Sequence, residues 1–193
     1  MRVIGGSLGG RRLVAPSGHA TRPTSDRVRE ALFNVLGDVS GAAVLDLYAG
    51  TGALGIEAIS RGASRVVFVE NGRPALAALR QNLTSLGIEG ASRVITQPVT
   101  RALASLASFG PFELILLDPP YAALVEAARV LDALAAETSN LVAPGARVVL
   151  EHASRDAPPE PARLVREETR IYGDTAISLY TRAEDVPSGA ADG

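Results

Sequence analysis

The distribution of apolar positions divides the chain into a short N-terminal part and a longer part of alternating elements. From residue 43 onward, apolar runs without clear polar alternation are separated by stretches with helical spacing. The expected strands cover 43–48, 65–70, 93–96, 112–118 and 146–151, and the expected helices cover 53–61, 74–86, 100–107 and 123–138. Two further strands, 163–171 and 175–182, follow without a helix between them and should pair antiparallel at one edge. This α/β pattern predicts a mostly parallel, seven-stranded sheet with helices on both faces.

The segment before residue 43 follows a different pattern. Two short extended pieces, Arg2–Ile4 and 11–15, are joined by a glycine-rich turn, which predicts an N-terminal β-hairpin extension over residues 1–23. Thr24 or Ser25 can then cap a helix that ends at Gly37 and carries apolar residues at helical spacing, namely Val28, Leu32, Val35 and Leu36. The main domain is expected to span 24–182, and the small, polar tail 183–193 to be disordered.

Composition narrows the class of protein. With 193 residues and 47% hydrophobic composition, the chain can bury one core. It contains no cysteine, which excludes disulfides and thiolate chemistry. We interpret its two histidines, His19 and His152, as surface or structural residues and expect no metal site. The chain lacks an apolar run of membrane-spanning length and a secretory signal, so we expect a cytoplasmic monomer without a membrane partner.

Basic residues are concentrated near the N-terminus, although the formal net charge is only −2. The first 30 residues contain two acidic residues, Asp26 and Glu30, and six arginines: Arg2, Arg11, Arg12, Arg22, Arg27 and Arg29. A glycine-rich hairpin carrying arginines suits contact with nucleic-acid phosphates, and we interpret these six as RNA-docking residues. The alternative is an ordinary solvated charged surface.

A glycine turn follows the first strand of the main domain. Gly50, Gly52 and Gly55 form a G-x-G-x-x-G-like sequence that lets a nucleotide cofactor approach the backbone. Glu70, at the end of the second strand, has the spacing at which a carboxylate binds ribose hydroxyls. Asp46 precedes the turn, where it would repel a dinucleotide's pyrophosphate but attract a cationic aminoacyl group. The pattern therefore favours S-adenosylmethionine over a dinucleotide.

The sequence Asp118-Pro119-Pro120-Tyr121 follows the very apolar fourth strand. Two consecutive prolines fix the chain direction and remove two backbone donors. The Asp118 carboxylate and the Pro119 carbonyl could then accept the protons of a base's exocyclic amine and orient its nitrogen toward a methyl donor. Tyr121 could stack on an extruded base. The alternative is that Asp118 caps the next helix and Tyr121 packs on the surface.

Taken in order, these motifs resemble those of the RsmD family, bacterial 16S rRNA (guanine(966)-N(2))-methyltransferases. The resemblance covers residues 2–182 and rests on the sequences RVIGGSLGGRRLVAP, RPTSDRVREALFNVL, VLDLYAGTGALGIEAISRGA, VVFVE, LILLDPPY and YGDTAISLY. The glycine turn and DPPY are common to many methyltransferases, whereas the second of these sequences is much more specific. The resemblance implies a Rossmann-like class I methyltransferase domain, S-adenosylmethionine as methyl donor and 16S rRNA as partner, within the small subunit or an assembly intermediate.

Residue roles also follow from the resemblance. Asp46, Gly50 and Gly52 would line the aminoacyl end of the cofactor, and Glu70 would hold the ribose. Pro98 stands where related enzymes often place Asp or Asn near the adenine, so that contact could pass to Gln97 or the Val99 amide. The catalytic group would be the four residues Asp118, Pro119, Pro120 and Tyr121.

Three other functions remain open at this point. DPPY also fits an adenine-N6 methyltransferase acting on DNA or RNA, although the sequence shows no obvious domain for recognising duplex DNA. A protein or small-molecule amine methyltransferase would leave the basic N-terminal segment without a role. A non-catalytic RNA-binding assembly factor could keep the fold, although the intact Asp118–Tyr121 cluster argues against it.

Overall fold

The predicted central sheet is confirmed by a computed structural model, which describes residues 1–15, 25–136 and 139–183. The strands are β1 (Ala43–Leu47), β2 (Arg65–Val69), β3 (Ser92–Ile95), β4 (Phe112–Leu117), β5 (Val142–Ala153), β6 (Leu164–Tyr172) and β7 (Thr175–Arg182). They form one seven-stranded sheet in the order β3-β2-β1-β4-β5-β7-β6. Strands β1 to β5 pair in parallel, and β7 pairs antiparallel with both β5 and β6. The strand order reverses at β1 and β4, where α/β sheets bind their ligands beyond the carboxyl ends of the strands.

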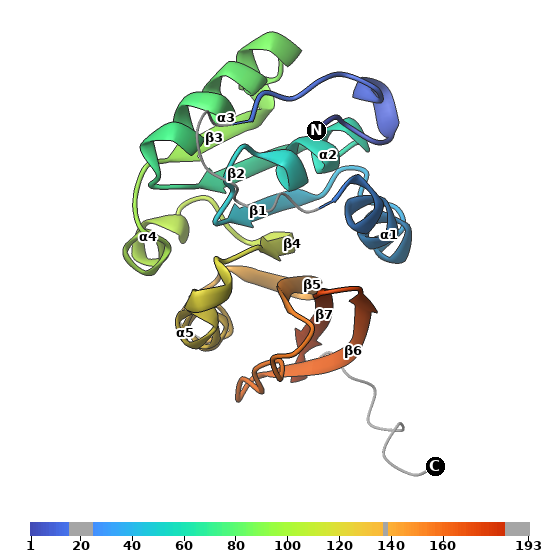
Figure 1. Cartoon of the computed structure of the whole chain (residues 1–193). Helices are drawn as coiled ribbons and strands as arrows, with labels where there is room; N and C mark the ends of the chain where they lie inside the picture. Colours follow the sequence, from blue (N-terminus) through green and yellow to red (C-terminus); the bar gives the residue numbers. More distant parts are fainter. Residues whose placement is uncertain (16–24, 137–138, 184–193) are drawn as a thin grey trace.

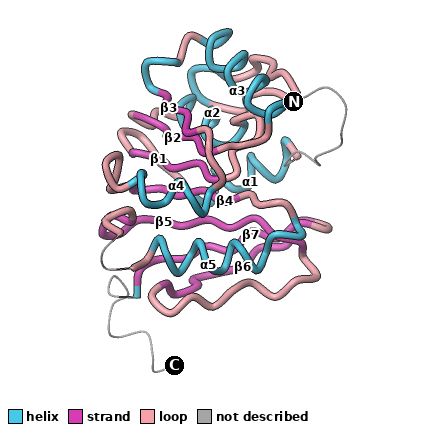
Figure 2. Tube along the Cα trace, turned by 90° about the vertical axis from the view of Figure 1, so that its left-hand side faces the viewer, coloured by secondary structure: helices cyan, strands magenta, loops and turns pink. Residues whose placement is uncertain are grey.

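Helices cover both faces of this sheet (Figures 1 and 2). On one face lie α1 (Asp26–Leu36), α2 (Ala53–Ser60) and α3 (Arg73–Leu86), and on the other lie α4 (Val99–Leu106) and α5 (Leu124–Leu134). Each face has its own apolar core. Val44, Leu116 and Val149 pack with the first group of helices, whereas Leu45 and Leu117 pack with α4 and α5. Because side chains along a strand alternate between the two faces of the sheet, these core residues also show toward which face the residue after each strand end points.

Element boundaries mostly follow the sequence pattern. Ser25 caps α1, with its Oγ accepting a hydrogen bond of 3.2 Å from the Val28 amide, and Gly37 ends the helix at φ 68°. Two boundaries differ from expectation. Helix α5 ends at Leu134 rather than near residue 138, and β5 starts at Val142 because the Pro144–Gly145 turn forms an irregularity inside the strand. Short 3-10 helices lie at η1 (Gly6–Leu8), η2 (Glu89–Ala91) and η3 (Tyr121–Ala123).

The N-terminal segment folds back as predicted, but it does not form a regular hairpin. The Val3 amide donates to the Arg11 carbonyl and the Gly10 amide to the Val3 carbonyl, both at 2.9 Å, around a single antiparallel bridge between Arg2 and Arg12. Between the two arms, the chain is bonded to α2 instead: the Leu8 amide donates to Ser60 Oγ at 2.9 Å. Side chains of α2 thus form hydrogen bonds with backbone groups that would pair with each other in a longer hairpin. The expected boundary at residue 23 and the tail 184–193 lie outside the described residues.

Within the described ranges, none of the helices combines the length and apolar character needed to cross a membrane.

Candidate active site

Three glycines shape the turn between β1 and α2, and each has a different role. Gly50 has φ +56°, and a Cβ there would meet only the Tyr48 carbonyl, 3.9 Å away. Gly52 has φ +83°, and its Cβ would approach Leu79 Cδ1 to 2.4 Å. A Cβ at Gly55 would lie 2.3 Å from Phe68 Cε1. Gly55 therefore allows α2 to pack closely on β2 and Gly52 allows the turn to pack against α3, while Gly50 leaves open space beside the backbone.

Asp46 lies under this turn, almost completely buried. Its Oδ2 accepts a hydrogen bond of 2.9 Å from the Gly55 amide, whereas Oδ1 is buried and has no hydrogen-bond partner among the described residues. Burial raises the pKa of Asp46 to about 8, the Gly55 hydrogen bond opposes this shift, and the nearby charges of Asp118 and Glu70 add to it. The site thus holds a carboxylate that a neighbouring cation would stabilise in its ionised form.

Glu70, at the end of β2, fastens the glycine turn. It accepts hydrogen bonds from the amides of Gly50 at 2.7 Å, Asn71 at 2.8 Å and Gly72 at 2.6 Å. A carboxylate has about four acceptor positions, so these bonds leave capacity for a ligand hydroxyl. The structure therefore gives Glu70 a structural role that the sequence did not reveal, beside its predicted ribose contact.

The predicted adenine contacts lie beyond β3. Gln97 is exposed, and Pro98 caps α4, its carbonyl accepting hydrogen bonds of 3.0 Å from the amides of Arg101 and Ala102. Val99 is the first residue of α4, so its amide has no partner within the helix. The adenine contacts of the Gln97 side chain and the Val99 amide stay predictions.

Asp118 directly follows β4, one residue beyond the pair Leu47 and Leu117. Its amide approaches the Leu47 carbonyl at 3.4 Å, and its side chain is half-buried. Pro119 is buried, whereas Pro120 is exposed and uses its carbonyl locally, accepting a 2.7 Å hydrogen bond from Ala123. The side chain of Tyr121 lies outside the described part of the structure. The turn after β4 thus lies beside the glycine turn after β1, at the ends of neighbouring strands.

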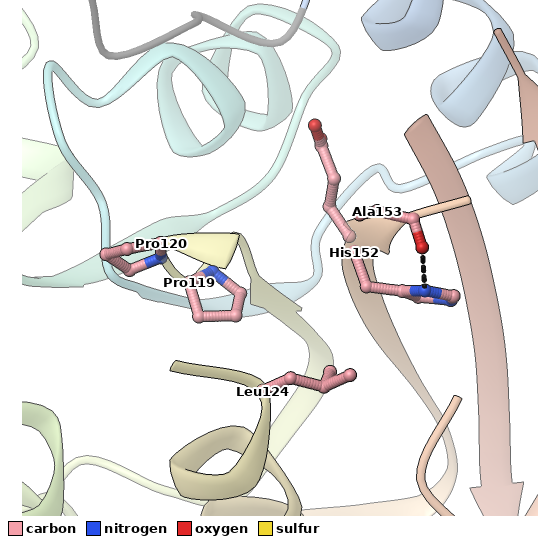
Figure 3. Close-up of a pocket in the computed structure, with 6 residues that line it drawn as sticks. Pro119, Pro120, Leu124, His152 and Ala153 are labelled. Carbon is pink, nitrogen blue, oxygen red and sulfur yellow. Dashed lines mark hydrogen bonds between the residues drawn. The ribbon is translucent and has the colours of Figure 1, made fainter. Parts of the chain in front are cut away.

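A small pocket lies next to this turn (Figure 3). Its lining comes from three elements, the turn after β4, the start of α5 and the end of β5, and consists of Pro119, Pro120, Leu124, Glu151, His152 and Ala153. His152 is buried, with Nε2 2.9 Å from Ser178 Oγ and Nδ1 3.0 Å from the Ala153 carbonyl. Its ring nitrogens are engaged within the fold, in agreement with the structural role expected for it. His19 lies outside the described residues.

Four of the six predicted RNA-contacting arginines are exposed: Arg2, Arg11, Arg12 and Arg27. Arg2 and Arg12 line a surface hollow together with Leu13 and Asp26. Arg11 Nη2 also donates to the Ser85 carbonyl of α3 at 3.2 Å. Arg22 lies outside the described residues. These four arginines are accessible to solvent, and their contact with RNA stays a prediction.

Arg29 does not belong to that surface, and this part of the prediction is wrong. Its side chain is fully buried, with Nη2 2.9 Å from Asp26 Oδ1 and Nε 3.7 Å from Glu57 Oε2. Its Nη2 also donates to the Arg2 carbonyl. Arg29 lies on the same face of α1 as Val28, Leu32 and Leu36, so the helix directs it into the core. Arg29 therefore binds the N-terminal segment inside the fold and is not accessible to RNA.

Glu57 is the counterpart of Arg29 and was not identified from the sequence. Its buried carboxylate accepts hydrogen bonds from the amides of Ile4 at 2.7 Å and Gly5 at 2.9 Å, and from Arg61 Nε at 2.8 Å. One carboxylate of α2 thus binds the N-terminal arm and two arginines. The available signal was a lone acidic residue between Ile56 and Ala58 in an otherwise apolar helix.

Asn82 makes a second connection between the N-terminal arm and the site. This buried side chain of α3 accepts a 2.7 Å hydrogen bond from the Val14 amide and donates to the carbonyls of Val14 at 3.2 Å and Thr51 at 3.0 Å. Thr51 belongs to the glycine turn, so Asn82 joins the basic arm directly to the predicted cofactor site. An amide on the apolar face of α3, beside Leu79 and Leu83, was the signal in the sequence.

Comparison with known proteins agrees with this arrangement. A family model described as Conserved hypothetical protein 95 matches residues 1–181. The Escherichia coli protein named ribosomal RNA small subunit methyltransferase D is 35% identical, with 98% of this chain and 94% of that protein covered. A solved structure of a hypothetical protein from Thermus thermophilus is 33% identical and superposes with a TM-score of 0.78, covering 93% of this chain and 98% of the other.

A more distant structure shares the fold. An RNA methyltransferase from Salinibacter ruber, solved in complex with S-adenosyl-L-homocysteine, superposes with a TM-score of 0.63 at 18% identity, covering 88% of this chain and 99% of that one. The fold is therefore the Rossmann-like fold of class I methyltransferases. Because the family model and the E. coli relative each cover nearly the whole chain, the chain belongs to the RsmD family of ribosomal RNA small subunit methyltransferases.

Proposed function

We propose that this protein transfers a methyl group from S-adenosylmethionine to the exocyclic N2 amine of a guanine in 16S rRNA, in the small ribosomal subunit or an assembly intermediate. The observation that carries the proposal is the position of the Asp118 turn beside the glycine turn, at the carboxyl ends of neighbouring strands β4 and β1. Membership of the RsmD family, with the name of the E. coli relative, supports rRNA as the substrate.

The residues present fit the cofactor. Asp46 Oδ1 is a buried acceptor without a hydrogen-bond partner among the described residues, and the cation of the aminoacyl group would favour the ionised form of Asp46, which burial disfavours. The open side of Gly50 lets the cofactor approach the backbone, and Gly52 holds the turn in shape. The remaining contacts are Glu70 to the ribose, and Gln97 or the Val99 amide to the adenine. When bound, S-adenosylmethionine supplies an electrophilic methyl group.

The protein's own contribution to the chemistry is orientation and charge. The lone pair of a guanine amine is delocalised into the ring, so the nitrogen is a poor nucleophile. With one amine proton accepted by the Asp118 carboxylate and the other by the Pro119 carbonyl, the nitrogen faces the methyl donor, and positive charge that develops on it is stabilised. Pro120 keeps the turn rigid, and Tyr121 stacks on the extruded base.

The N-terminal arm positions the RNA. Arg2, Arg11 and Arg12 are exposed on a segment held to α2 and α3 by Glu57 and Asn82. Arg27, near the start of α1, is exposed as well, and the sequence adds Arg22, which lies outside the described residues. A firmly anchored basic arm places phosphate contacts at a fixed distance from the methyl donor, which is what orientation of one base requires.

The test is the Asp118→Ala variant. We expect the single-turnover rate of methyl transfer to fall about 100-fold or more, with little change in S-adenosylhomocysteine affinity, because Asp118 acts on the amine. Asp132→Ala, a change at an exposed carboxylate of α5, is the matched control and should retain the full rate. Equal rates in wild type and Asp118→Ala would refute the assigned role. Loss of turnover with intact RNA binding would also exclude a non-catalytic assembly factor.

A further inference from the structure

Glu151 lies beside Asp118 on the neighbouring strand. The last register pair between β4 and β5 joins Leu117 to Leu150, and Asp118 and Glu151 each follow by one residue. Leu116 and Val149, two positions earlier, both pack on the face covered by α1, α2 and α3. Side chains two residues apart on a strand point to the same face, so Asp118 and Glu151 share one side of the sheet at adjacent positions.

Glu151 is one of the residues that line the small pocket beside the Asp118 turn. Glu151 is only 6% exposed, and the pocket it lines is bounded by Pro119, Pro120 and Leu124 (Figure 3). A buried carboxylate is costly unless polar groups meet it. Glu151 has an interaction within the protein, yet a carboxylate offers about four acceptor positions and can also take a ligand donor.

His152, the next residue, cannot take this role in its present arrangement. Its side chain belongs to the opposite face, and both ring nitrogens contact the β5 and β7 strands, at the Ala153 carbonyl and Ser178 Oγ. Of the two ionisable residues that line the pocket, Glu151 is therefore the one placed on the side of Asp118 and the glycine turn.

The edge of guanine supplies a suitable partner for such an acceptor. In guanine, the N2 amine is adjacent to an N1–H donor, whereas in 2-aminopurine the same amine is adjacent to an N1 lone pair. Adenine likewise has an N1 lone pair beside its N6 amine. If the Asp118 turn holds the amine, an acceptor on the neighbouring strand faces the next atom of the same base edge.

Resting on the proposed function, we propose that Glu151 is a specificity-determining residue, whose carboxylate accepts the N1–H of the target guanine while Asp118 and Pro119 hold its N2 amine. Bases with an N1 lone pair are rejected, because that lone pair would face the acceptor lone pairs of the carboxylate and the two acceptors would repel each other. Glu151 thus selects guanine, and Asp118 orients the reacting nitrogen.

The experiment changes the target base of the RNA and the side chain of Glu151 in combination. Small subunits are reconstituted with 16S rRNA that carries either guanine or 2-aminopurine at the mapped target, and kcat/KM for methyl transfer is measured with wild type and Glu151→Gln. The glutamine amide can donate to the N1 lone pair of 2-aminopurine. We expect wild type to favour guanine and Glu151→Gln to move the guanine to 2-aminopurine ratio about 10- to 100-fold toward 2-aminopurine, the range for one hydrogen bond to a charged group.

This ratio does not depend on how much of the variant is folded, because the same enzyme preparation acts on both substrates. Glu167→Gln, an exposed change on β6, is the matched control and should keep the wild-type ratio. An unchanged ratio in Glu151→Gln would overturn the inference about Glu151 and leave guanine methylation intact. Failure of wild type to methylate the guanine substrate, with label on adenine instead, would overturn the proposed function and the inference together.

Discussion

Replacing Glu57 by glutamine should weaken the attachment of the N-terminal arm and the fold as a whole. The change keeps the side-chain volume but removes the charge that faces Arg29 and Arg61, and it puts an NH2 group where an oxygen accepted from Ile4, Gly5 or Arg61. Breaking one partner of a buried ion pair costs about 3–5 kcal/mol. At about 2–4 °C per kcal/mol for a domain of this size, the melting temperature should fall by roughly 6–20 °C.

The matched control for Glu57 is Glu113→Gln. Glu113 also accepts one backbone hydrogen bond, from Ala43 at 2.7 Å, but its side chain is exposed, so the loss should be no more than about 1.5 kcal/mol. Urea denaturation gives the two free energies of unfolding, and hydrogen exchange at the Ile4 and Gly5 amides reports the arm itself. Equal losses in the two variants, with unchanged exchange at Ile4 and Gly5, would refute the anchoring role of Glu57.

Three further outcomes follow from the site. Between about pH 4 and 8, Asp46 keeps a proton in the folded protein that it releases in the unfolded chain. The free energy of unfolding, measured by urea denaturation, should therefore fall as pH rises through this window, by up to about 1.4 kcal/mol per pH unit. The Asp46→Asn variant should show no such slope. Asn82→Ala should weaken S-adenosylhomocysteine binding by about tenfold in calorimetry, because Thr51 loses its support, and unchanged affinity would contradict the connection. Arg12→Ala should lower the salt dependence of RNA binding in a filter assay while cofactor affinity stays constant.

The sheet could be predicted from the sequence because buried parallel strands and the helices between them have distinct periodicities. The segment FELILLD and the glycine turn each located the end of a strand, and adjacent strand ends meet at one edge of a parallel sheet. The antiparallel pair β6 and β7 was predictable because no helix separates the two segments.

Residues whose role depends on long-range contacts were not predictable in the same way. Arg29 shares a face of α1 with Val28, Leu32 and Leu36, but the sequence does not show that Glu57 supplies a buried partner for its charge. Asn82 is hydrogen-bonded to Val14, 68 positions away in the sequence; its place on the apolar face of α3 indicates a buried amide, but nothing local identifies Val14 as its partner. The irregular N-terminal arm likewise depends on α2 side chains rather than on its own strand propensity.

The proposed reaction is measured most directly by transfer of labelled methyl from S-adenosylmethionine to small ribosomal subunits from a strain that lacks this gene, followed by mapping of the modified base. Naked rRNA and duplex DNA serve as parallel substrates. We expect N2-methylguanine at one position of 16S rRNA and no label on DNA. Label on adenine or on DNA, or no transfer to any of the three substrates, would contradict it.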